Sequence, residues 1–428
     1  MRHFPSCWNK TLTQLGFQRK PRSKKRKQRT FRRSPRIENL EARQMLSADY
    51  TVDTLTDEFD GSTTDGDVSL RDALYAAAND GESDTDIIDF ASHLKGGTIE
   101  LDRLLGLGDL DVDSDVQILG LGAGLLTIDA NGNASNQQRG FNVTDGVTAT
   151  ISGLTIKGGY ETTGGGVFAD NANLTLSNVK LQDNYSSDAG GAIATLNSSL
   201  LLQDSSISNN QAAGSTCGIL FSYDASSTGD ESLLILNSTI EQNSSDGVAG
   251  GVRLLRETGS TGLVRNILIV DSSISHNQAQ TGGGGLVISE GFDVVANELT
   301  LSDNHTTAGH GGGVHIDGTE VTFNNSEISH NSAAEGYGGG IYGVNAGSID
   351  INNSTIAHNK ALIGAGVFKE LHGIDRLDVV SSSILHNRAE HDSLATSAAG
   401  IYLDDDGVAG SDGVFTLVNS TVAYNQSR

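Results

Sequence analysis

Apolar residues recur at alternate positions along most of this chain, and each apolar group precedes an asparagine by a constant distance. Nine asparagines, at the ends of segments such as LQDN, ISHN and VAYN, have an apolar residue three positions earlier, and most have two more, eight and ten positions earlier. A period of two is typical of a half-buried strand and not of a helix. The pattern therefore predicts short strands before these asparagines, which are Asn184, Asn210, Asn243, Asn277, Asn304, Asn331, Asn359, Asn387 and Asn425.

Two further features of the repeat predict where the chain bends. Asn or Asp recurs six positions before most of the nine asparagines, as at Asn178, Asp204 and Asn237. These residues suit bends because they tolerate the left-handed backbone conformation. A glycine cluster and an aliphatic residue follow most repeats, as in Gly164 to Val167 and Gly338 to Ile341. This indicates a glycine-rich turn that enters a third strand.

The spacing of the repeat predicts the fold. Successive asparagines are separated by 26, 33, 34, 27, 27, 28, 28 and 38 residues, which suggests one rung of a solenoid per interval. We expect an all-β parallel β-helix of roughly a dozen three-strand rungs, about 55 to 60 Å long if neighbouring strands lie about 4.8 Å apart. Equivalent asparagines would then meet in neighbouring rungs and form a hydrogen-bonded amide ladder.

The ends of the predicted rod differ. Residues 69–79, SLRDALYAAAN, form the best helical stretch in the chain, and Ser69 and Asp72 have the spacing of a capping box. A helix here would cover the unpaired edge of the first rung. After Asn425 only three residues follow and no cap is recognisable, so we expect this sequence to be part of a longer chain.

Charge divides the chain into two parts. The 428 residues carry 28 Lys and Arg against 53 Asp and Glu. Residues 1–46 hold 14 of the basic side chains and two acidic ones, so the remainder has a formal charge of −37. Such a body is not expected to bind nucleic acid, because phosphate binding relies on Lys and Arg. No apolar run approaches the roughly 18 residues of a transmembrane helix.

These observations predict three parts. Residues 1–48 are expected to be a disordered basic leader for export or processing, although the 11 basic residues among positions 19–36 are also typical of a nucleic-acid-binding arm. Residues 49–130 would form the N-terminal cap and the first rungs. Residues 131–428 would form the β-helix repeats.

Several segments resemble known families. DGDVSLRDALYAAAND, followed by DIIDF, GTIEL and TISGLTIKGG, resembles the CSLREA domain, which opens many bacterial surface-associated right-handed β-helix proteins; Val68 stands where that family has Cys. IENLEARQMLSAD, from Ile37 to Asp49, resembles the LEPR-XLL motif, with Ala42 in place of Pro. The glycine-rich repeats are similar to those of polymorphic outer-membrane proteins and of the pectin-lyase-like superfold.

The resemblance implies a right-handed β-helix that is exported and displayed at the cell surface or outer membrane. Its partner would be a cell-surface or extracellular macromolecule, for example a carbohydrate. Pectin-lyase-like folds often act on polysaccharides, so each candidate for catalysis needs to be weighed separately.

Two groups of residues are candidates for polysaccharide chemistry. His310, in Gly309-His310-Gly311, reproduces a tripeptide of polygalacturonases, but the accompanying motifs are absent and the position matches the glycine turn of neighbouring rungs. Asp404, Asp405 and Asp406 could supply a general acid and base or oxygen ligands for Ca²⁺. We favour a solvated loop for the three aspartates. We interpret His310 as a residue of the repeated glycine turn, without a catalytic role.

A second acidic group is Asp109, Asp111, Asp113 and Asp115, which alternate in LGDLDVDSDV. Their spacing predicts one shared strand face. Ser114 stands where an EF-hand loop requires Gly, so weak Ca²⁺ binding is the secondary interpretation of an acidic outer face.

Histidines form the most unusual pattern. His276, His330, His358 and His386 each precede one of the nine asparagines, and the last three fall in consecutive rungs. Their side chains are expected to stack about 5 Å apart, as a metal site or a pH-sensitive stripe. Simple copying of an ISHN unit is the explanation that we favour, because no Cys or carboxylate stands at a fixed ligand spacing. We therefore expect no bound metal and no cofactor.

The function that these features favour is a non-catalytic secreted or cell-surface β-helix, acting as a stalk or an adhesin-like display module. One alternative is a polysaccharide lyase or hydrolase that uses His310 or the Asp404 to Asp406 segment. Another is an extracellular module stiffened by Ca²⁺.

Overall fold

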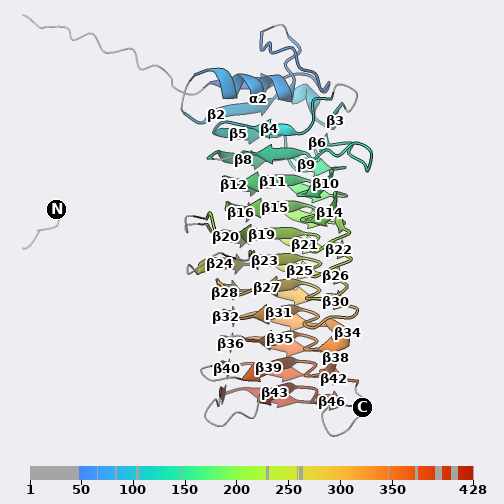
Figure 1. Cartoon of the computed structure of the whole chain (residues 1–428), viewed down its shortest axis with the longest axis vertical. Helices are drawn as coiled ribbons and strands as arrows, with labels where there is room; N and C mark the ends of the chain where they lie inside the picture. Colours follow the sequence, from blue (N-terminus) through green and yellow to red (C-terminus); the bar gives the residue numbers. More distant parts are fainter. Residues whose placement is uncertain are drawn as a thin grey trace, which may run out of the picture. The chain divides into compact units, whose positions relative to one another are not determined.

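The computed structural model describes residues 48–427 except 65, 82–83, 103–105, 145, 228–230, 258, 260–263, 346, 372–374, 391–397 and 406–412. The predicted leader, residues 1–48, therefore lies almost entirely outside the described residues. Residues 48 onward form a right-handed parallel β-helix, in which rungs stack along one axis (Figure 1). This confirms the predicted fold class.

Four parallel sheets, and not three, run along the helix. The first sheet, at the left of Figure 1, consists of the second strand after each glycine turn. Its strands are β1 (Asp49–Val52), β2 (Asp86–Phe90), β5 (Val116–Leu119), β8 (Thr148–Ser152), β12 (Asn173–Ser177), β16 (Ser199–Gln203), β20 (Leu233–Leu236), β24 (Arg265–Val270), β28 (Phe292–Asn297), β32 (Glu320–Asn324), β36 (Ser348–Asn352), β40 (Arg376–Val380) and β44 (Val414–Val418).

The second sheet carries the apolar residue three positions before each repeated asparagine. Its strands are β3 (Gly97–Glu100), β6 (Leu126–Asp129), β9 (Thr155–Lys157), β13 (Lys180–Gln182), β17 (Ser206–Ser208), β21 (Thr239–Glu241), β25 (Ser273–Ser275), β29 (Thr300–Ser302), β33 (Glu327–Ser329), β37 (Thr355–Ala357), β41 (Ser383–Leu385) and β45 (Thr421–Ala423).

The third sheet begins directly after each repeated asparagine. Its strands are β10 (Tyr160–Thr163), β14 (Tyr185–Ala189), β18 (Gln211–Ala212), β22 (Ser244–Ser245), β26 (Gln278–Ala279), β30 (His305–Thr306), β34 (Ser332–Tyr337), β38 (Lys360–Ile363), β42 (Arg388–Ala389) and β46 (Gln426–Ser427).

The fourth sheet follows the glycine turn and occupies the middle of Figure 1. Its strands are β4 (Leu110–Val112), β7 (Phe141–Val143), β11 (Val167–Asp170), β15 (Ile193–Leu196), β19 (Ile219–Tyr223), β23 (Val252–Arg256), β27 (Leu286–Ile288), β31 (Val314–Asp317), β35 (Ile341–Val344), β39 (Val367–Leu371) and β43 (Ile401–Asp405).

The prediction of three strands per rung was wrong because most strands of the third sheet are too short to show a period. Several of them, such as β18 and β22, have only two residues. Two residues cannot display an alternation of apolar and polar positions. They are strands only because equivalent residues pair in the rungs above and below, as Gln211 does with Ser244.

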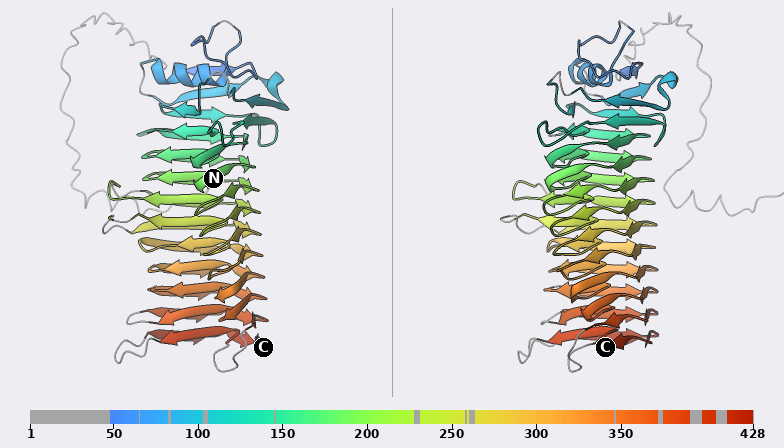
Figure 2. Two further views of the ribbon diagram at one scale, coloured as in Figure 1. Left: turned by 45° about the vertical axis from the view of Figure 1, so that its right-hand side comes forward. Right: turned by 90° about the vertical axis from the view of Figure 1, so that its right-hand side faces the viewer.

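Apolar side chains of the four sheets fill the interior in register. In the second sheet Ile240 pairs with Ile274, and Ile274 pairs with Leu301. All three side chains are fully buried. Burial of one such side chain contributes about 1.5 to 3 kcal/mol. The views of Figure 2 show the rungs stacked on one another over the whole described length.

A continuous ladder of buried asparagines links the rungs. The Nδ2 of each of the first eight repeated asparagines, from Asn184 to Asn387, donates to the Oδ1 of the next, over 2.9 to 3.1 Å. The same Oδ1 accepts a backbone N–H, as Asn304 does from Asn277. The amide ladder that the repeat predicts is therefore present, and it satisfies polar groups that would be costly if buried alone.

The glycine cluster exists because the ladder needs room. A Cβ placed on Gly340 would lie 2.7 Å from the carbonyl oxygen of Gly366 and 3.0 Å from the Nδ2 of Asn359. The first approach is closer than real Cβ atoms make, and the second is tighter than nearly all of their contacts. Glycine at this turn thus lets the backbone of one rung pass beside the asparagine of the next.

The predicted bends adopt the left-handed conformation. Asn178, Asp204 and Asn237 have φ values of 50°, 51° and 46°, and His330 and His358, at the second bend, have 57° and 59°. Each rung therefore turns twice at a single residue with positive φ, between the first and second sheets and between the second and third.

Helix α2 (Leu70–Asn79) covers the N-terminal end of the rod, and a short 3₁₀ helix, η1 (Ser92–Leu94), follows β2. The Ser69 side chain accepts the backbone N–H of Asp72, and the Asp72 carboxylate accepts the N–H of Ser69. Both hydrogen bonds of the capping box are present, so the helix starts where its sequence signal lies. Among the described residues, no helix is long and apolar enough to cross a membrane.

We expect Asn304→Ala to lower the free energy of unfolding by about 3 to 5 kcal/mol, because it leaves buried groups of both neighbouring rungs unpaired. The Asn304 side chain accepts from Asn277 N and Nδ2 and donates to Ile274 O and Asn331 Oδ1. Urea denaturation followed by circular dichroism measures the change.

The matched control for this variant is Asn325→Gly, at an exposed bend where φ is 51°. Glycine tolerates this backbone conformation, so the expected loss is below about 1 kcal/mol. Equal losses in the two variants would show that the ladder contributes nothing specific.

Candidate functional site

His310 lies in the turn between β30 and β31 and is held by aromatic neighbours. Its Nδ1 accepts a hydrogen bond from the backbone N–H of Tyr337 over 3.0 Å. Its ring stacks on Tyr337 and Tyr342, with ring centroids 5.0 and 4.6 Å away. Burial lowers the pKa of His310 below its ordinary value. The imidazole is therefore neutral near pH 7 and uses one nitrogen for the structure of the turn.

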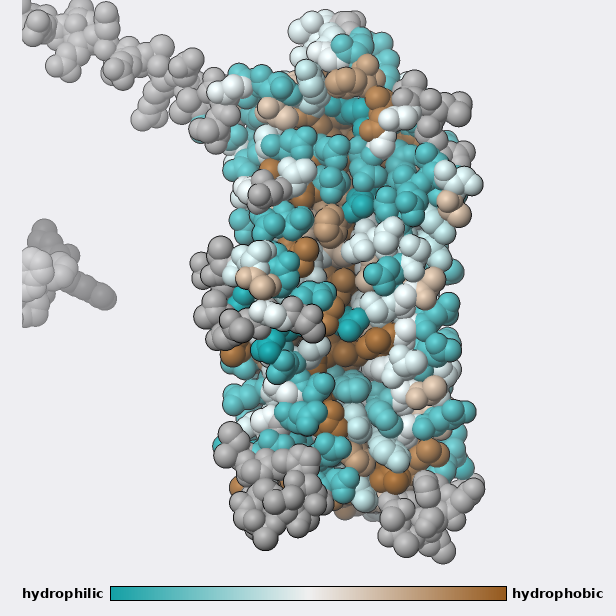
Figure 3. Space-filling view, viewed as in Figure 1, coloured by the Kyte–Doolittle hydropathy of each residue, from teal (hydrophilic) through white to brown (hydrophobic). Residues whose placement is uncertain are grey.

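The rings continue as a column on the outer face of the fourth sheet. Tyr337 and Tyr342 both stack on Phe368, and Phe368 stacks on Tyr402, each at 5.1 Å. We call His310, Tyr337, Tyr342, Phe368 and Tyr402 the aromatic column. Its rings face one another, so solvent meets their edges. Figure 3 shows hydrophobic side chains gathered along the middle of this face.

Burial within the aromatic column changes the chemistry of its hydroxyl group. Tyr342 and Phe368 are 9% and 3% exposed although they point away from the interior of the rod. Burial, followed by the negative charges of Glu370, Asp317 and Asp404, raises the pKa of Tyr342 to about 12. The phenol stays protonated at physiological pH.

Sequence reasoning missed the aromatic column, although a signal for it exists. An aromatic residue directly follows the first aliphatic residue after the glycine turn in three of the last four rungs, at Tyr342, Phe368 and Tyr402. Register aligns these positions in neighbouring strands. Aromatic residues at one repeat position predict a stack once the parallel register is known.

Of the three candidate aspartates, Asp404 can be placed relative to His310, and it lies apart from it. Asp404 and Asp405 lie in β43 and not in a loop, and Asp404 is exposed beside Glu370 of the neighbouring strand. Asp406 and the side chain of Asp405 lie outside the described residues. The strand of Asp404 is three rungs beyond that of His310, which corresponds to about 14 Å. A proton cannot pass directly between groups so far apart.

The histidine stripe has the predicted spacing. The rings of His330 and His358 stack at 4.9 Å and those of His358 and His386 at 5.1 Å, with Tyr424 at 5.1 Å beyond them. His276 instead faces Asp303, with Nε2 4.0 Å from the carboxylate. Parallel stacked rings do not direct their nitrogens at one point. No group of three His, Cys, Asp or Glu in the described part of the chain could hold a metal ion.

The acidic group near the N-terminus is divided between elements, so the prediction of one strand face was wrong. β4 ends at Val112, and only Asp111 points outward from it. Asp109 forms an ion pair with Arg139 over 2.8 Å, and Asp115 accepts the backbone N–H of Thr148 in a corner. The alternation of Asp with other residues in the sequence continues through a bend that interrupts the strand.

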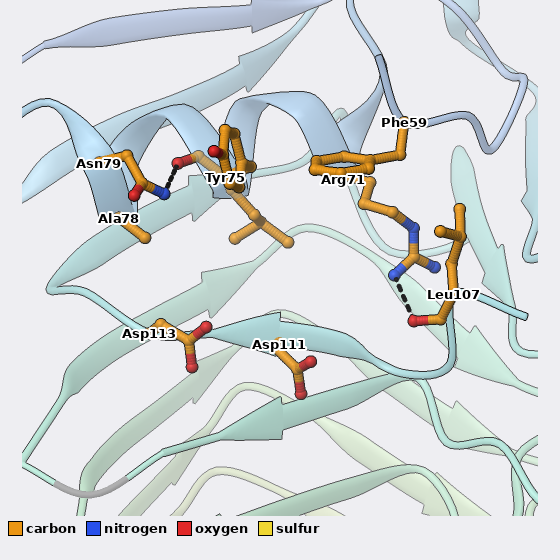
Figure 4. A pocket seen from close by; sticks show the side chains of 9 residues that line it. Phe59, Arg71, Tyr75, Ala78, Asn79, Leu107, Asp111 and Asp113 are labelled. Atoms are coloured by element: carbon orange, nitrogen blue, oxygen red, sulfur yellow. Dashed lines mark hydrogen bonds between the residues drawn. The ribbon is translucent and has the colours of Figure 1, made fainter. Parts of the chain in front are cut away.

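A pocket of about 280 Å³ lies between helix α2 and β4 (Figure 4). We call it the cap pocket. Figure 4 shows the helix on one side of the pocket, and Asp111 and Asp113 on the other. The lining residues are Phe59, Arg71, Leu74, Tyr75, Ala78, Asn79, Leu107, Asp111 and Asp113. Sequence analysis recognised the helix and the aspartates but could not bring them together, because their contact depends on how the cap folds back on the first rungs.

Comparison with known proteins agrees with the fold. A family model for the right-handed beta helix region matches residues 117–252. No curated protein matches the chain. The similarities to the CSLREA domain, to the LEPR-XLL motif and to polymorphic outer-membrane proteins are not among these matches and stay predictions.

Among solved structures, pectate lyase Pel9A is 12% identical, with a TM-score of 0.37, over 89% of this chain and 78% of that one. The A-module of the Azotobacter vinelandii mannuronan C-5 epimerase AlgE6 is 16% identical, with a TM-score of 0.31, over 84% and 95%. A mannuronic acid specific family 6 lyase from human gut microbiota is 10% identical, with a TM-score of 0.37, over 84% and 92%. These likenesses concern the fold, and no residue role is carried over from them.

We expect His358→Asn to weaken the dependence of thermal stability on pH between about 7 and 5.5. Burial and the neighbouring His330 and His386 lower the pKa of His358. A lowered pKa means that protonation favours the unfolded chain, so this stability is present above the ordinary histidine pKa of about 6.5 and is lost as the pH falls. Glu327 also faces His358 and acts in the opposite direction.

Melting temperatures measured by circular dichroism across this pH range test the prediction, and asparagine suits the positive φ of the position. His276→Asn is the control, because it occupies the same bend with φ of 56° but faces Asp303 and not another imidazole. A pH dependence that is the same in wild type and His358→Asn would remove the stripe as a pH-sensitive element.

Proposed function

We propose that this chain is a non-catalytic β-helical rod, exported and displayed at the cell surface, which acts as a stalk or an adhesin-like binding surface. The environment of His310 carries the proposal. One ring nitrogen accepts the Tyr337 N–H, and Tyr337 and Tyr342 cover the ring. Such a histidine has the properties of a packing residue.

The positions of the described carboxylates support the same view. Glycosidic bond cleavage by carboxylates needs two of them within about 5 to 10 Å of each other, on either side of the bond. His310 and Asp404 are separated by about 14 Å of rod. Glu370 and Asp404 are partners in neighbouring parallel strands, about 5 Å apart, so they stand side by side on one face of the sheet and not on either side of a bound sugar.

Charge and regularity favour particular partners. The formal charge of −37 on residues 47–428 opposes polyanionic ligands and is compatible with neutral or cationic surfaces. The asparagine ladder joins every rung from Asn184 to Asn425 through buried hydrogen bonds. A rod built in this way holds a fixed length and presents its outer faces to an extracellular partner such as a neutral carbohydrate.

We expect no turnover of acidic or neutral polysaccharides by the full chain, because no described pair of groups has acid–base geometry at His310. Reducing-end and unsaturated-product assays over a polysaccharide panel measure this. Saturable turnover that disappears in His310→Ala or Asp404→Ala would replace the proposal with the enzymatic alternative. Retained secondary structure in these variants, measured by circular dichroism, keeps that outcome interpretable.

We expect the protein in native cells to be found in the surface or secreted fraction and to be degraded by protease added outside the cells. An antibody against residues 160–428 detects it in the fractions. A cytoplasmic enzyme measured in the same fractions controls for lysis. Recovery with the cytoplasmic marker and protection from protease would contradict surface display.

A further inference from the structure

The cap pocket contains an arginine whose hydrogen-bond donors are all occupied and whose charge is balanced. The Arg71 guanidinium binds Asp57 through Nε and Nη2 over 2.9 and 3.1 Å. Its other N–H groups donate to the backbone carbonyls of Leu107, Gly108 and Asp109. All five donors of the guanidinium are therefore occupied, and its charge is balanced by a buried carboxylate. Arg71 forms part of the pocket wall without offering a site for an anion.

The opposite wall carries negative charge that no described side chain neutralises. Asp111 and Asp113 are exposed. Asp111 accepts one hydrogen bond, from the neutral amide of Asn142, over 2.8 Å. None of the ion pairs within the described residues includes Asp111 or Asp113. With Arg71 balanced by Asp57, the pocket carries the charge of two carboxylates.

Two aromatic rings line the same pocket, and Tyr75 stands on the helix across from these carboxylates. Phe59 and Tyr75 contact each other edge to face, with centroids 5.0 Å apart, and are 45% and 47% exposed. Exposure of a large aromatic side chain is unusual in the described part of this rod: the other exposed aromatic residues there, Phe415 and Tyr424, belong to its last strands and the bend between them. The rings of Phe59 and Tyr75 thus remain available at the surface of the pocket.

We propose that the cap pocket binds an alkylammonium group, such as the end of a lysine side chain of an extracellular peptide partner. A cation over an aromatic ring gains about 0.5 to 1 kcal/mol at an exposed site and more where water is excluded. The carboxylates of Asp111 and Asp113 accept its N–H groups, and Leu74 and Ala78 contact its methylene stem.

The same features exclude other ligand classes. A phosphate or carboxylate would meet two carboxylates and a guanidinium without free donors. A divalent metal ion would require a third oxygen or nitrogen ligand, and no such group of three exists among the described residues. The inference is independent of the proposed function, because a lysine-binding cap is compatible with a rod of either catalytic or non-catalytic character.

The test measures binding of Nα-acetyl-lysine methylamide to the full chain by ligand-observed NMR, with the norleucine analogue as the neutral probe. We expect saturable binding of the lysine probe and roughly tenfold weaker binding of the norleucine probe, because the latter lacks the charge. Affinity should also fall as salt is added. Equal affinity for the two probes, or no saturable binding of the lysine probe, would overturn the proposal.

Variants identify the site. Asp111→Asn combined with Asp113→Asn should weaken binding of the lysine probe roughly tenfold, and Tyr75→Ala should weaken it several-fold. Asp303→Asn, an exposed aspartate at a bend far along the chain, is the control and should bind as the wild type does. An unchanged affinity in the double variant would place the binding elsewhere and refute the assignment. Melting temperatures verify that the cap of each variant is folded.

Discussion

The structure depends on one interaction, the hydrogen bond between the side-chain amides of equivalent asparagines in neighbouring rungs. Each amide is both donor and acceptor, so it can bind the asparagine before it and the one after it. This satisfies a polar side chain that is fully buried at the corner between the second and third sheets. It also fixes the register, since a slip by one residue would bury unpaired amides along the whole rod.

The ladder constrains the surfaces where function could arise. Glycine is required opposite the asparagines, and the chain re-enters the fourth sheet at a sharp corner. Side chains that point outward just after this corner are crowded against the next rung, as Tyr342 and Phe368 are. Their rings stack on one another and expose edges. The repeat therefore stabilises its own outer face, and among the described residues exposed aromatic rings occur at the two ends, in the cap and on the last strands.

Sequence reasoning was sufficient where a residue type is dictated by the repeat. The ladder asparagines, the bends with positive φ and the capping box at Ser69 follow from spacing alone. The fourth strand of each rung could not be predicted, because two-residue strands such as β18 carry no periodic signal. The cap pocket was also beyond prediction, because Phe59, Tyr75 and Asp113 meet only after the cap has folded onto β4. The spacing of residues within a repeat predicts the structure of a rung. The pocket instead depends on contacts between segments that are not part of a repeat.

Each rung presents equivalent groups to the rung before it and to the rung after it. Such a molecule can therefore change in length by whole rungs. The upper and lower faces of an interior rung present the same amide, the same bend and the same apolar positions, as in the pairing of β32 with β36 and of β36 with β40. Duplication or loss of a segment of 27 or 28 residues, the commonest spacing in this sequence, would join equivalent surfaces without creating a new interface. Tandem recombination can thus change the length of the rod in steps of about 4.8 Å and leave the side-chain contacts within every remaining rung unchanged.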